Sequence, residues 1–410
     1  MIKNIKTISD FNFKNKTALL RTDFNVPVNK YHKITDDTRI QYSIPTIQKI
    51  ISEKGKVVII SHFGRPKGFP SKTYSLKFLI PILSKILKLS VKFFENCIGK
   101  NVEKKVNELE NGDVLLLENL RFYKEEEEEN ENFAFELSKL GDIYVNDAFG
   151  ASHRSHTSIT VLPKLFQEKK CIGFLMQKEI QFLNKFFLSK KENRPITILL
   201  GGAKISSKIE IIENIINFAD HILIGGGMSY PFILKKGGRI GNSLIEKEKN
   251  KMIKIEKILT KIINKCQKKN ILHLPKDVII TNSFNNTKTT KISSIYSIPD
   301  GWTGLDIGPS SIKYFCDFIE QSKTILWNGP VGVFENPNFS LGTISIAEKI
   351  AKTTEKGAFS LVGGGDSIAA LKMGGYDKKI SYLSTGGGAL LESLKKKVLP
   401  GIKSLILNNN

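Results

Sequence analysis

Cysteine is scarce in this sequence, and the four cysteines stand far apart, at Cys97, Cys171, Cys266 and Cys316. No two of them form a CxxC pair, so the pattern indicates neither a disulfide framework nor a cysteine-based metal site. Long hydrophobic runs are also missing, because no apolar stretch approaches the ~20 residues that span a bilayer. The first ten residues lack the apolar core of a signal peptide. We therefore expect a cytoplasmic protein with reduced thiols and no membrane association.

Acidic residues are in deficit, since 62 Lys and Arg residues outnumber 40 Asp and Glu residues and give a formal net charge of +22. Such an excess can serve nucleic acids, membranes or small anions. The lysines are spread along the chain, however, and no basic stripe with interleaved aromatic residues is present. We expect most of this charge on a solvated surface and predict no specific nucleic-acid partner. The acidic run 125–129 is expected to be a solvated helix start without a chemical role.

The usual glycine signatures of nucleotide folds are missing too, because the chain contains no GxxxxGK[ST] and no fitting GxGxxG. Instead, short aliphatic runs recur, each followed by a polar or glycine-rich loop and a helical pattern. The runs cover residues 18–20, 57–60, 114–117, 143–145, 172–174, 196–200, 222–224, 271–274, 324–327, 359–362 and 380–383. Continuous apolar runs are typical of strands buried on both faces, so two parallel sheets flanked by helices are predicted. A length of 410 residues also favours two domains.

Basic side chains follow the predicted strands of the first half. Arg21, Asp23 and Asn25 follow the first strand, and Arg39 lies in the next segment. Later strands are followed by further candidates, namely His62, Arg65, Arg121, His153, Arg154 and His156. Parallel strands deliver their carboxyl ends to one edge, and arginine binds carboxylate and phosphate with two prongs. A small acid bearing a phosphate and a hydroxyl would satisfy this set, whereas pairing with nearby carboxylates is the alternative for any single arginine.

Glycine-rich loops follow the predicted strands of the second half. Residues 201–208, GGAKISSK, place two glycines and the lysines Lys204 and Lys208 at a strand–helix turn, and we expect the lysines to share one face of the helix start. Residues 225–227 can admit a base or ribose, Glu335 is a candidate acceptor for a ribose hydroxyl, and residues 301–309 are expected to form a tight loop. Asp366 is an oxygen ligand that suits Mg²⁺. The half therefore predicts a nucleotide site built largely from backbone N–H groups.

Taken in order, these motifs resemble those of the phosphoglycerate kinase family over nearly the whole chain. They read RTDFNVP, SHFGRP, LLENLRF, NDAFGASHRSH, GFLMQKE, GGAKISSK, GGGMSYPF, LPKD, GLDIGP, LWNGPVGVFE, GGGDS, STGGGA and VLPGI. The resemblance implies two Rossmann-like α/β domains joined by a hinge helix over 175–189. The first would span 1–174 and receive the C-terminal segment 391–410, and the second would span 190–390. It also implies reversible phosphoryl transfer from 1,3-bisphosphoglycerate to MgADP, giving 3-phosphoglycerate and MgATP, in a glycolytic enzyme that is a monomer.

The same resemblance assigns residues to two sites. For 3-phosphoglycerate it implies Asp23, Phe24, Asn25, Arg39, His62, Phe63, Gly64, Arg65, Arg121 and Arg154. For ADP or ATP it implies Lys204, Lys208, Gly225, Gly226, Gly304, Asn328, Glu335, Gly364, Gly365, Asp366, Ser367, Gly386, Gly387 and Gly388. Arg39, Lys204 and Lys208 would act on the moving phosphoryl group, and Asp366 would meet the Mg²⁺. The alternatives are a nucleic-acid-binding protein and a nucleotide-binding protein without catalysis.

Overall fold

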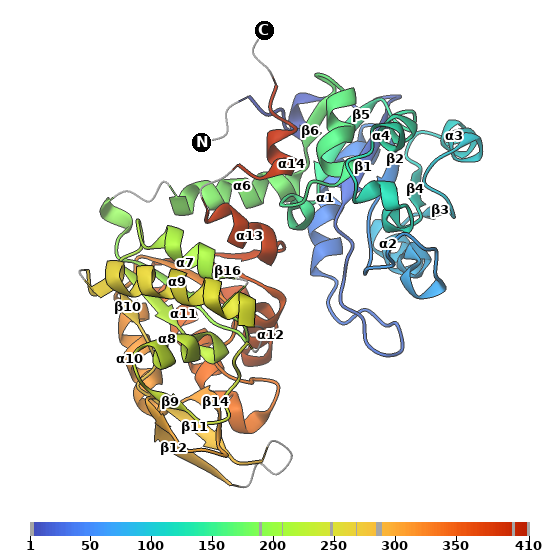
Figure 1. Cartoon of the computed structure of the whole chain (residues 1–410). Coiled ribbons are helices and arrows are strands. Elements are labelled where there is room, and N and C mark those ends of the chain that lie inside the picture. Colours follow the sequence, from blue (N-terminus) through green and yellow to red (C-terminus); the bar gives the residue numbers. More distant parts are fainter. Residues whose placement is uncertain are drawn as a thin grey trace. The chain divides into compact units, whose positions relative to one another are not determined.

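The computed structural model describes residues 4–187, 191–206, 208–246, 249–267, 269–283, 289–395 and 398–407. The chain divides into two compact units. Unit 1 comprises Met1–Asn184 together with Val398–Asn410, and unit 2 comprises Lys185–Lys397. Each unit contains its own six-stranded parallel sheet (Figure 1). The predicted fold class, two parallel α/β domains, is confirmed.

The sheet of unit 1 has the strand order β3-β4-β2-β1-β5-β6, and all its pairings are parallel. Its strands are β1 (Thr17–Thr22), β2 (Lys56–Ile60), β3 (Lys92–Phe94), β4 (Val114–Leu117), β5 (Ile143–Asp147) and β6 (Lys170–Ile172). The α-helices are α1 (Thr38–Ser52), α2 (Ile80–Leu87), α3 (Lys100–Asn107), α4 (Glu131–Ser138), α5 (Leu162–Leu165), α6 (Phe174–Phe187) and α14 (Pro400–Lys403). Helix α6 begins in unit 1 and its last residues belong to unit 2.

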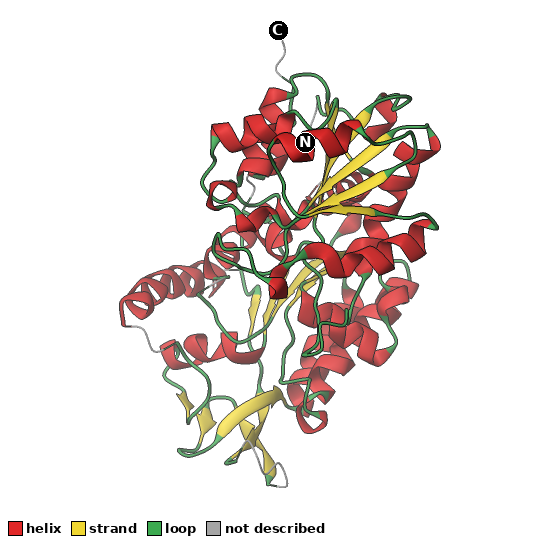
Figure 2. Ribbon diagram, turned by 90° about the vertical axis from the view of Figure 1, so that its right-hand side faces the viewer, coloured by secondary structure: helices red, strands yellow, loops and turns green. Residues whose placement is uncertain are grey.

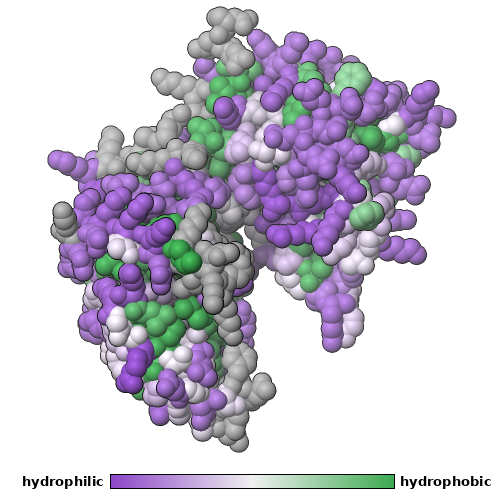
Figure 3. All heavy atoms as spheres, viewed as in Figure 1, coloured by the Kyte–Doolittle hydropathy of each residue, from purple (hydrophilic) through white to green (hydrophobic). Residues whose placement is uncertain are grey.

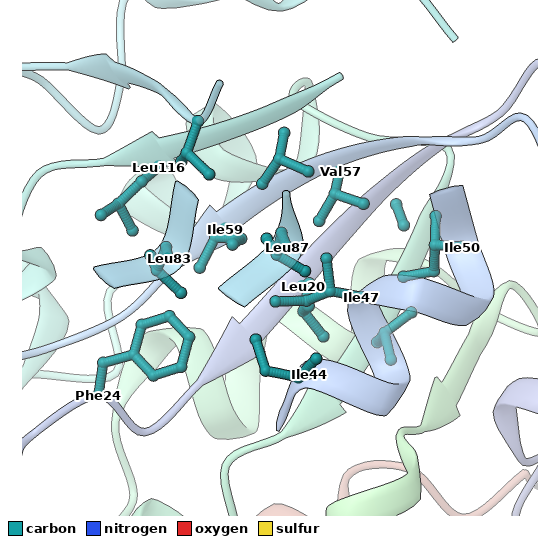
Figure 4. Packing of buried hydrophobic residues seen from close by; sticks show 14 of the residues in the cluster. Leu20, Phe24, Ile44, Ile47, Ile50, Val57, Ile59, Leu83, Leu87 and Leu116 are labelled. Atoms are coloured by element: carbon teal, nitrogen blue, oxygen red, sulfur yellow. The ribbon is translucent and has the colours of Figure 1, made fainter. Parts of the chain in front are cut away.

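Aliphatic side chains from β1, β2 and β4 meet those of α1 and α2 in the core of unit 1. Figure 4 shows Leu20, Ile59 and Leu116 of the sheet facing Ile47 of α1 and Leu83 of α2. All five side chains are fully excluded from solvent. This burial explains why the strands read as continuous apolar runs rather than as an alternating pattern. The hydrophobic contacts hold the sheet rigid, and therefore fix the positions of the loops that leave its carboxyl edge.

The sheet of unit 2 has the strand order β10-β8-β7-β15-β16-β17 and is also parallel throughout. Its strands are β7 (Ile196–Leu200), β8 (His221–Ile224), β10 (Leu272–His273), β15 (Thr324–Asn328), β16 (Phe359–Gly363) and β17 (Tyr382–Ser384). The α-helices are α7 (Ile209–Ile215), α8 (Tyr230–Lys235), α9 (Lys249–Gln267), α10 (Pro309–Gln321), α11 (Leu341–Glu355), α12 (Gly365–Gly374) and α13 (Gly387–Ser393). Helices flank the strands (Figure 2). Trp327 of β15 is fully buried in the core of this unit.

Two small sheets in unit 2 were not predicted. One has the order β12-β11-β14, and the other pairs β13 with β9. Their strands are β9 (Arg239–Ile240), β11 (Asp277–Thr281), β12 (Thr290–Ser294), β13 (Ser297–Ile298) and β14 (Thr303–Ile307). The expectation of a tight loop over 301–309 was therefore wrong, because most of that segment pairs with β11 as strand β14. The glycines in the segment favoured a loop, whereas the segment forms a strand that pairs with β11, about two dozen residues earlier.

Several predicted boundaries also need correction. The run 172–174 is not a strand, because β6 ends at Ile172 and α6 begins at Phe174. The run 380–383 gives a strand only from Tyr382, and strand β3 was missed. The predicted helix 175–189 corresponds to α6 up to Phe187, and residues 188–190 lie outside the described residues. Helix α7 begins at Ile209 with Lys208 as its N-cap. Lys204 and Lys208 therefore precede the helix and do not share a helical face.

The surface is largely hydrophilic on the face seen in Figure 3. Within the described residues, no helix combines the length and the apolar character that a bilayer crossing requires. The four cysteines are free thiols: Cys97, Cys171 and Cys266 are buried, and Cys316 is partly exposed.

Candidate functional site

The strand order brings the predicted anion-binding side chains of unit 1 to one edge of the sheet. Strand β1 has β2 as its neighbour on one side and β5 on the other, so the strand order reverses at β1. In open α/β sheets, ligands bind at the carboxyl edge beside such a reversal. Asp23 and Asn25 follow β1 directly, and His62 follows β2. Arg121 lies in the 3₁₀ turn Leu120–Phe122 after β4, and Arg154 follows β5.

Hydrogen bonds join these loops into one network. Arg39 Nη1 donates to Asp23 Oδ1 at 3.1 Å and to the carbonyl of Asn25 at 2.9 Å. The Asn25 side-chain oxygen accepts from the Gly64 N–H at 2.9 Å, and the Gly64 carbonyl accepts from Arg121 Nη1 at 2.6 Å. The loops after β1, β2 and β4 therefore hold each other in place.

The position of Gly64, between the loops that contain Asn25 and Arg121, favours glycine. Its φ of +60° lies in the left-handed region, and a Cβ there would stand 2.3 Å from the Tyr74 ring. The glycine therefore lets the loop turn tightly enough to present both its N–H and its carbonyl to neighbouring loops.

Cations outnumber carboxylates around this network. Their pKa values are lowered by burial and by repulsion between neighbouring cations. Burial lowers the pKa of Arg121 to about 10, with Arg154 adding repulsion. Burial, followed by repulsion from Arg65, lowers the pKa of Arg154. The pKa of His62 falls well below its ordinary value, chiefly through burial and then through Arg21, so His62 is neutral at pH 7. Arg121 Nη2 is buried and makes no hydrogen bond among the described residues. An anion would relieve this repulsion, so the arrangement favours a negatively charged ligand.

Two predicted substrate residues differ from the others. The Phe24 ring is fully buried in the core beside Leu83 (Figure 4). The Phe63 ring is also buried and packs 5.0 Å from the Phe78 ring, centroid to centroid. Only the backbone of these two residues remains for contact with a ligand. Arg65, in contrast, is exposed.

A separate cavity of about 930 Å³ in unit 1 contains none of the predicted site residues. It lies beside α14 and is lined partly by Lys164, Lys170 and Lys403. Its size alone does not make it the site, because the converging arginines and the strand-order reversal lie elsewhere in the unit.

Two adjoining cavities mark the carboxyl edge of the sheet in unit 2. The smaller, about 190 Å³, lies where the strand order reverses between β7 and β15 and is lined by the loop after each strand. Its lining includes the predicted residues Lys204, Lys208, Asn328, Gly364, Gly365, Asp366 and Ser367. The larger, about 470 Å³, includes Gly226, Gly304, Glu335 and again Asp366. Gly202 and Pro330 line both, so the two cavities share a wall.

The smaller cavity has the character of a phosphate cradle. Lys208 Nζ donates to the carbonyl oxygens of Gly201 at 2.8 Å and Asn328 at 3.2 Å. Burial lowers the Lys208 pKa to about 8, although the Asp366 charge raises it. Helix α12 starts at Gly365, and its N-cap Gly364 has a φ of +100°. The N–H groups at a helix start, beside a partly buried ammonium group, suit a phosphate.

Ser367 and Asn328 form hydrogen bonds that hold the backbone around the smaller cavity. The Ser367 side chain is fully buried, and its Oγ accepts from the Gly329 N–H at 2.7 Å. Asn328 Nδ2 donates to the Gly363 carbonyl at 2.6 Å. These bonds tie the carboxyl end of β15 to the carboxyl end of β16 and to the first turn of α12.

The larger cavity has the lining expected for a base and ribose. Its apolar part includes Leu244, Val278, Leu305 and Val331, none of which the sequence had indicated as a site residue. Leu244 has half of its surface exposed. Glu335 is exposed at the rim.

Four predicted glycines lie outside both cavity linings: Gly225, Gly386, Gly387 and Gly388. Gly387 packs closely on the cradle, since a Cβ there would stand 2.8 Å from the Gly364 Cα. A Cβ on Gly225 would stand 2.5 Å from Val331 Cγ1. These two glycines therefore act by allowing close packing behind the lining.

One carboxylate faces the cradle in a position suited to a cation. Asp366 is exposed and lines both cavities. Among the described residues, no cluster of three or more His, Cys, Asp or Glu side chains could hold a metal ion. A single carboxylate beside a phosphate cradle fits Mg²⁺ that arrives with a nucleotide, since Mg²⁺ commonly takes one or two protein carboxylates plus substrate phosphates.

Comparison with known proteins identifies relatives that match nearly the whole chain. The family model described as phosphoglycerate kinase matches residues 8–397. The phosphoglycerate kinase of Porphyromonas gingivalis is 44% identical, over 97% of this chain and 99% of that protein. The cytosolic phosphoglycerate kinase of Triticum aestivum is 44% identical, over 98% of both chains. The solved phosphoglycerate kinase structures from Pyrococcus horikoshii and Coxiella burnetii match with TM-scores of 0.85 and 0.82, at 32% and 35% identity, over 98% of both chains.

Proposed function

Because the chain belongs to the phosphoglycerate kinase family, we propose that unit 1 binds the phosphoglycerate and unit 2 the nucleotide. The reaction of the enzyme is the reversible transfer of the acyl phosphate of 1,3-bisphosphoglycerate to ADP, which gives 3-phosphoglycerate and ATP in glycolysis. Nothing in the comparisons favours the alternatives of nucleic-acid binding or a catalytically silent nucleotide binder. The observation that carries the assignment of ligands is the contrast between the two carboxyl edges: converging arginines in unit 1, and a backbone cradle beside a partly apolar cavity in unit 2.

In unit 1, the proposed phosphoglycerate site uses its excess positive charge. Arg65 is near enough to lower the pKa of Arg154, and Arg154 is near enough to lower the pKa of Arg121. A phosphate and a carboxylate would offset this repulsion and form charge-assisted hydrogen bonds. Asp23 and Asn25 would take the hydroxyl group.

In unit 2, the nucleotide would place its base in the 470 Å³ cavity and its phosphates in the 190 Å³ cavity. Glu335 would accept from a ribose hydroxyl, and Lys208 and the α12 N–H groups would bind the phosphates. We assign Asp366 as the carboxylate that would hold Mg²⁺, and the ion would supply positive charge to neutralise the phosphates.

The transfer needs no general base, because the accepting carboxylate is already ionised at neutral pH. The protein therefore contributes position and charge on an in-line phosphoryl transfer. We propose that Arg39 supplies charge from unit 1 and Lys204 from unit 2. Since water would compete for the phosphoryl group, we also propose that the two units approach each other when both ligands are bound.

A coupled assay of ATP-dependent phosphorylation of 3-phosphoglycerate tests these roles. Arg39→Ala and Lys204→Ala should each lower kcat by ~100-fold or more, by precedent for charge-stabilising groups. Lys77→Ala, a change at an exposed lysine in unit 1 outside the network, is the matched control and should leave kcat unchanged. Wild-type kcat in either of the first two variants would remove that residue from the proposed mechanism.

We further propose that the enzyme is cytoplasmic and monomeric. The cytoplasmic assignment rests on four unpaired cysteines in a chain with no CxxC pair. Size-exclusion chromatography with light scattering would test the monomer, since a mass near twice 46.0 kDa would contradict it.

A further inference from the structure

The acidic run 125–129 contains one glutamate that is completely buried. Glu126 ends the 3₁₀ turn Lys124–Glu126 and has no exposed surface, whereas Glu125, Glu127, Glu128 and Glu129 are exposed. The expectation of a wholly solvated helix start was therefore wrong. A buried carboxylate is costly unless other groups compensate it, so its contacts indicate what it does.

Glu126 lies next to buried basic side chains of unit 1. Its Oε2 accepts from the Ser158 N–H at 3.0 Å, and its Oε1 accepts from Ser158 Oγ at 2.6 Å. Arg21 Nη2 and His156 Nδ1 each lie 3.8 Å from Oε1. Burial raises the Glu126 pKa, and the Arg21 charge and the Ser158 hydrogen bonds oppose that rise. Because both oxygens accept hydrogen bonds, the carboxylate form fits this environment.

Arg21 connects Glu126 to His62. Its side chain is fully buried, and its Nε donates to Ser158 Oγ at 2.8 Å. Its Nη2 contacts His62 Nδ1 at 3.3 Å. A guanidinium group only donates, so His62 Nδ1 must be the acceptor. The single proton of the neutral imidazole is then on Nε2, which lies 3.8 Å from Asp23 Oδ1.

We propose that Glu126 is a positioning residue which, through Ser158 and Arg21, holds His62 in the tautomer that turns an Nε2–H donor toward the phosphoglycerate. The inference rests on the proposed phosphoglycerate site, of which His62 and Asp23 are members. Glu126 itself touches no ligand. Its carboxylate fixes the guanidinium group, and the guanidinium group fixes the imidazole proton.

The direction of the kinetic effect separates this role from simple electrostatics. Removal of a negative charge beneath an anion site would, by charge alone, tighten anion binding and lower KM. Loss of an oriented donor would instead raise KM. If the donor acts equally on bound substrate and transition state, kcat should change little. A purely structural role would lower the active fraction, and hence apparent kcat, without raising KM.

The first measurement is the tautomer of His62 without any ligand. The protein contains six histidines, so long-range ¹H–¹⁵N spectra of histidine-labelled enzyme are tractable, and a His62→Gln variant identifies the signals. Wild type should show an acceptor-type Nδ1 and a protonated Nε2. In Glu126→Gln, which keeps the side-chain shape, a mixture of tautomers should appear.

The second measurement is the KM for 3-phosphoglycerate. Glu126→Gln should raise it by about 10-fold, the scale of one lost hydrogen bond to a charged ligand, with kcat within about 3-fold of wild type. Glu128→Gln is the matched control, because Glu128 is exposed in the same run, and both of its readings should equal wild type. If Glu126→Gln does not fold, Ser158→Ala tests the same link, since it removes the bridging hydroxyl and keeps every charge.

An Nδ1–H tautomer in wild type would overturn the inference. So would a folded Glu126→Gln enzyme with the wild-type tautomer and an unchanged or lower KM. A changed tautomer with an unchanged KM would overturn the link to the substrate and would remove His62 from the proposed phosphoglycerate site. Because the tautomer is read without ligand, the two failures are distinguishable.

Discussion

Lys208 gives the sharpest quantitative prediction, because its pKa in the free enzyme is about 8 rather than 10.5. Burial causes the shift, and the two carbonyl oxygens that Lys208 contacts carry no full charge to offset it. A bound phosphate would restore the charged form and raise the pKa again. Binding of ADP should therefore take up a proton at mildly alkaline pH, and affinity should fall as pH rises through about 8.

The size of the effect follows from the shift. At pH 8.5 only about a quarter of free Lys208 would be charged, so binding should take up roughly 0.7 proton per ADP. Between pH 8 and pH 9.5 the affinity should weaken by about 15-fold. Isothermal titration calorimetry in two buffers of different ionisation enthalpy measures the uptake directly.

Two variants isolate Lys208. Lys208→Met should abolish the proton uptake, and Lys208→Arg should abolish it while keeping the charge, because arginine does not titrate in this range. Lys261→Met, at an exposed lysine of α9, should retain the full uptake. Uptake that is absent in wild type, or that persists in Lys208→Met, would refute the placement of Lys208 against the phosphates.

Three further predictions concern stability and turnover. Burial raises the Asp147 pKa to about 7, so this group stabilises the fold most below its unfolded pKa near 4 and loses that contribution as pH rises to about 7. Asp147→Asn should therefore remove a slope of at most about 1.4 kcal/mol per pH unit from urea-unfolding free energies between pH 5 and 7, and identical slopes would refute it. Gly64→Ala should destabilise the enzyme by about 1 kcal/mol or more through its left-handed backbone and the Tyr74 contact, which an unchanged melting temperature would contradict. X-ray scattering should show a smaller radius of gyration with both ligands than with either alone, and equal radii would count against closure of the two units.

The continuous aliphatic runs predicted the fold well, because a strand buried on both faces has one composition whatever its neighbours are. The central strands β1, β2, β4, β5, β7, β8, β15 and β16 all match predicted runs. The small sheet of β11, β12 and β14 was missed because its exposed strands, such as Thr290–Ser294, carry polar residues and pair through tertiary contacts. Propensity is a weak guide where packing decides.

The sequence predicted where many of the candidate residues lie, but not their burial or their contacts. The arginines of unit 1 and the glycine triplets of unit 2 do follow the carboxyl ends of the parallel strands, as the sequence predicted. The burial of Glu126 was invisible, because nothing in a run of five glutamates shows which one turns inward. The core positions of the Phe24 and Phe63 rings were equally hidden, since a motif records that a residue adjoins a site and not which way its side chain points.

The division of ligands between the two units is the central claim, and crossed binding titrations test it most directly. The test compares Arg154→Ala in unit 1 and Glu335→Ala in unit 2, each titrated separately with 3-phosphoglycerate and MgADP. Arg154→Ala should weaken binding of 3-phosphoglycerate by about 10-fold or more and leave MgADP unchanged, and Glu335→Ala should do the reverse. Loss of MgADP binding in Arg154→Ala, with 3-phosphoglycerate binding intact, would contradict the account.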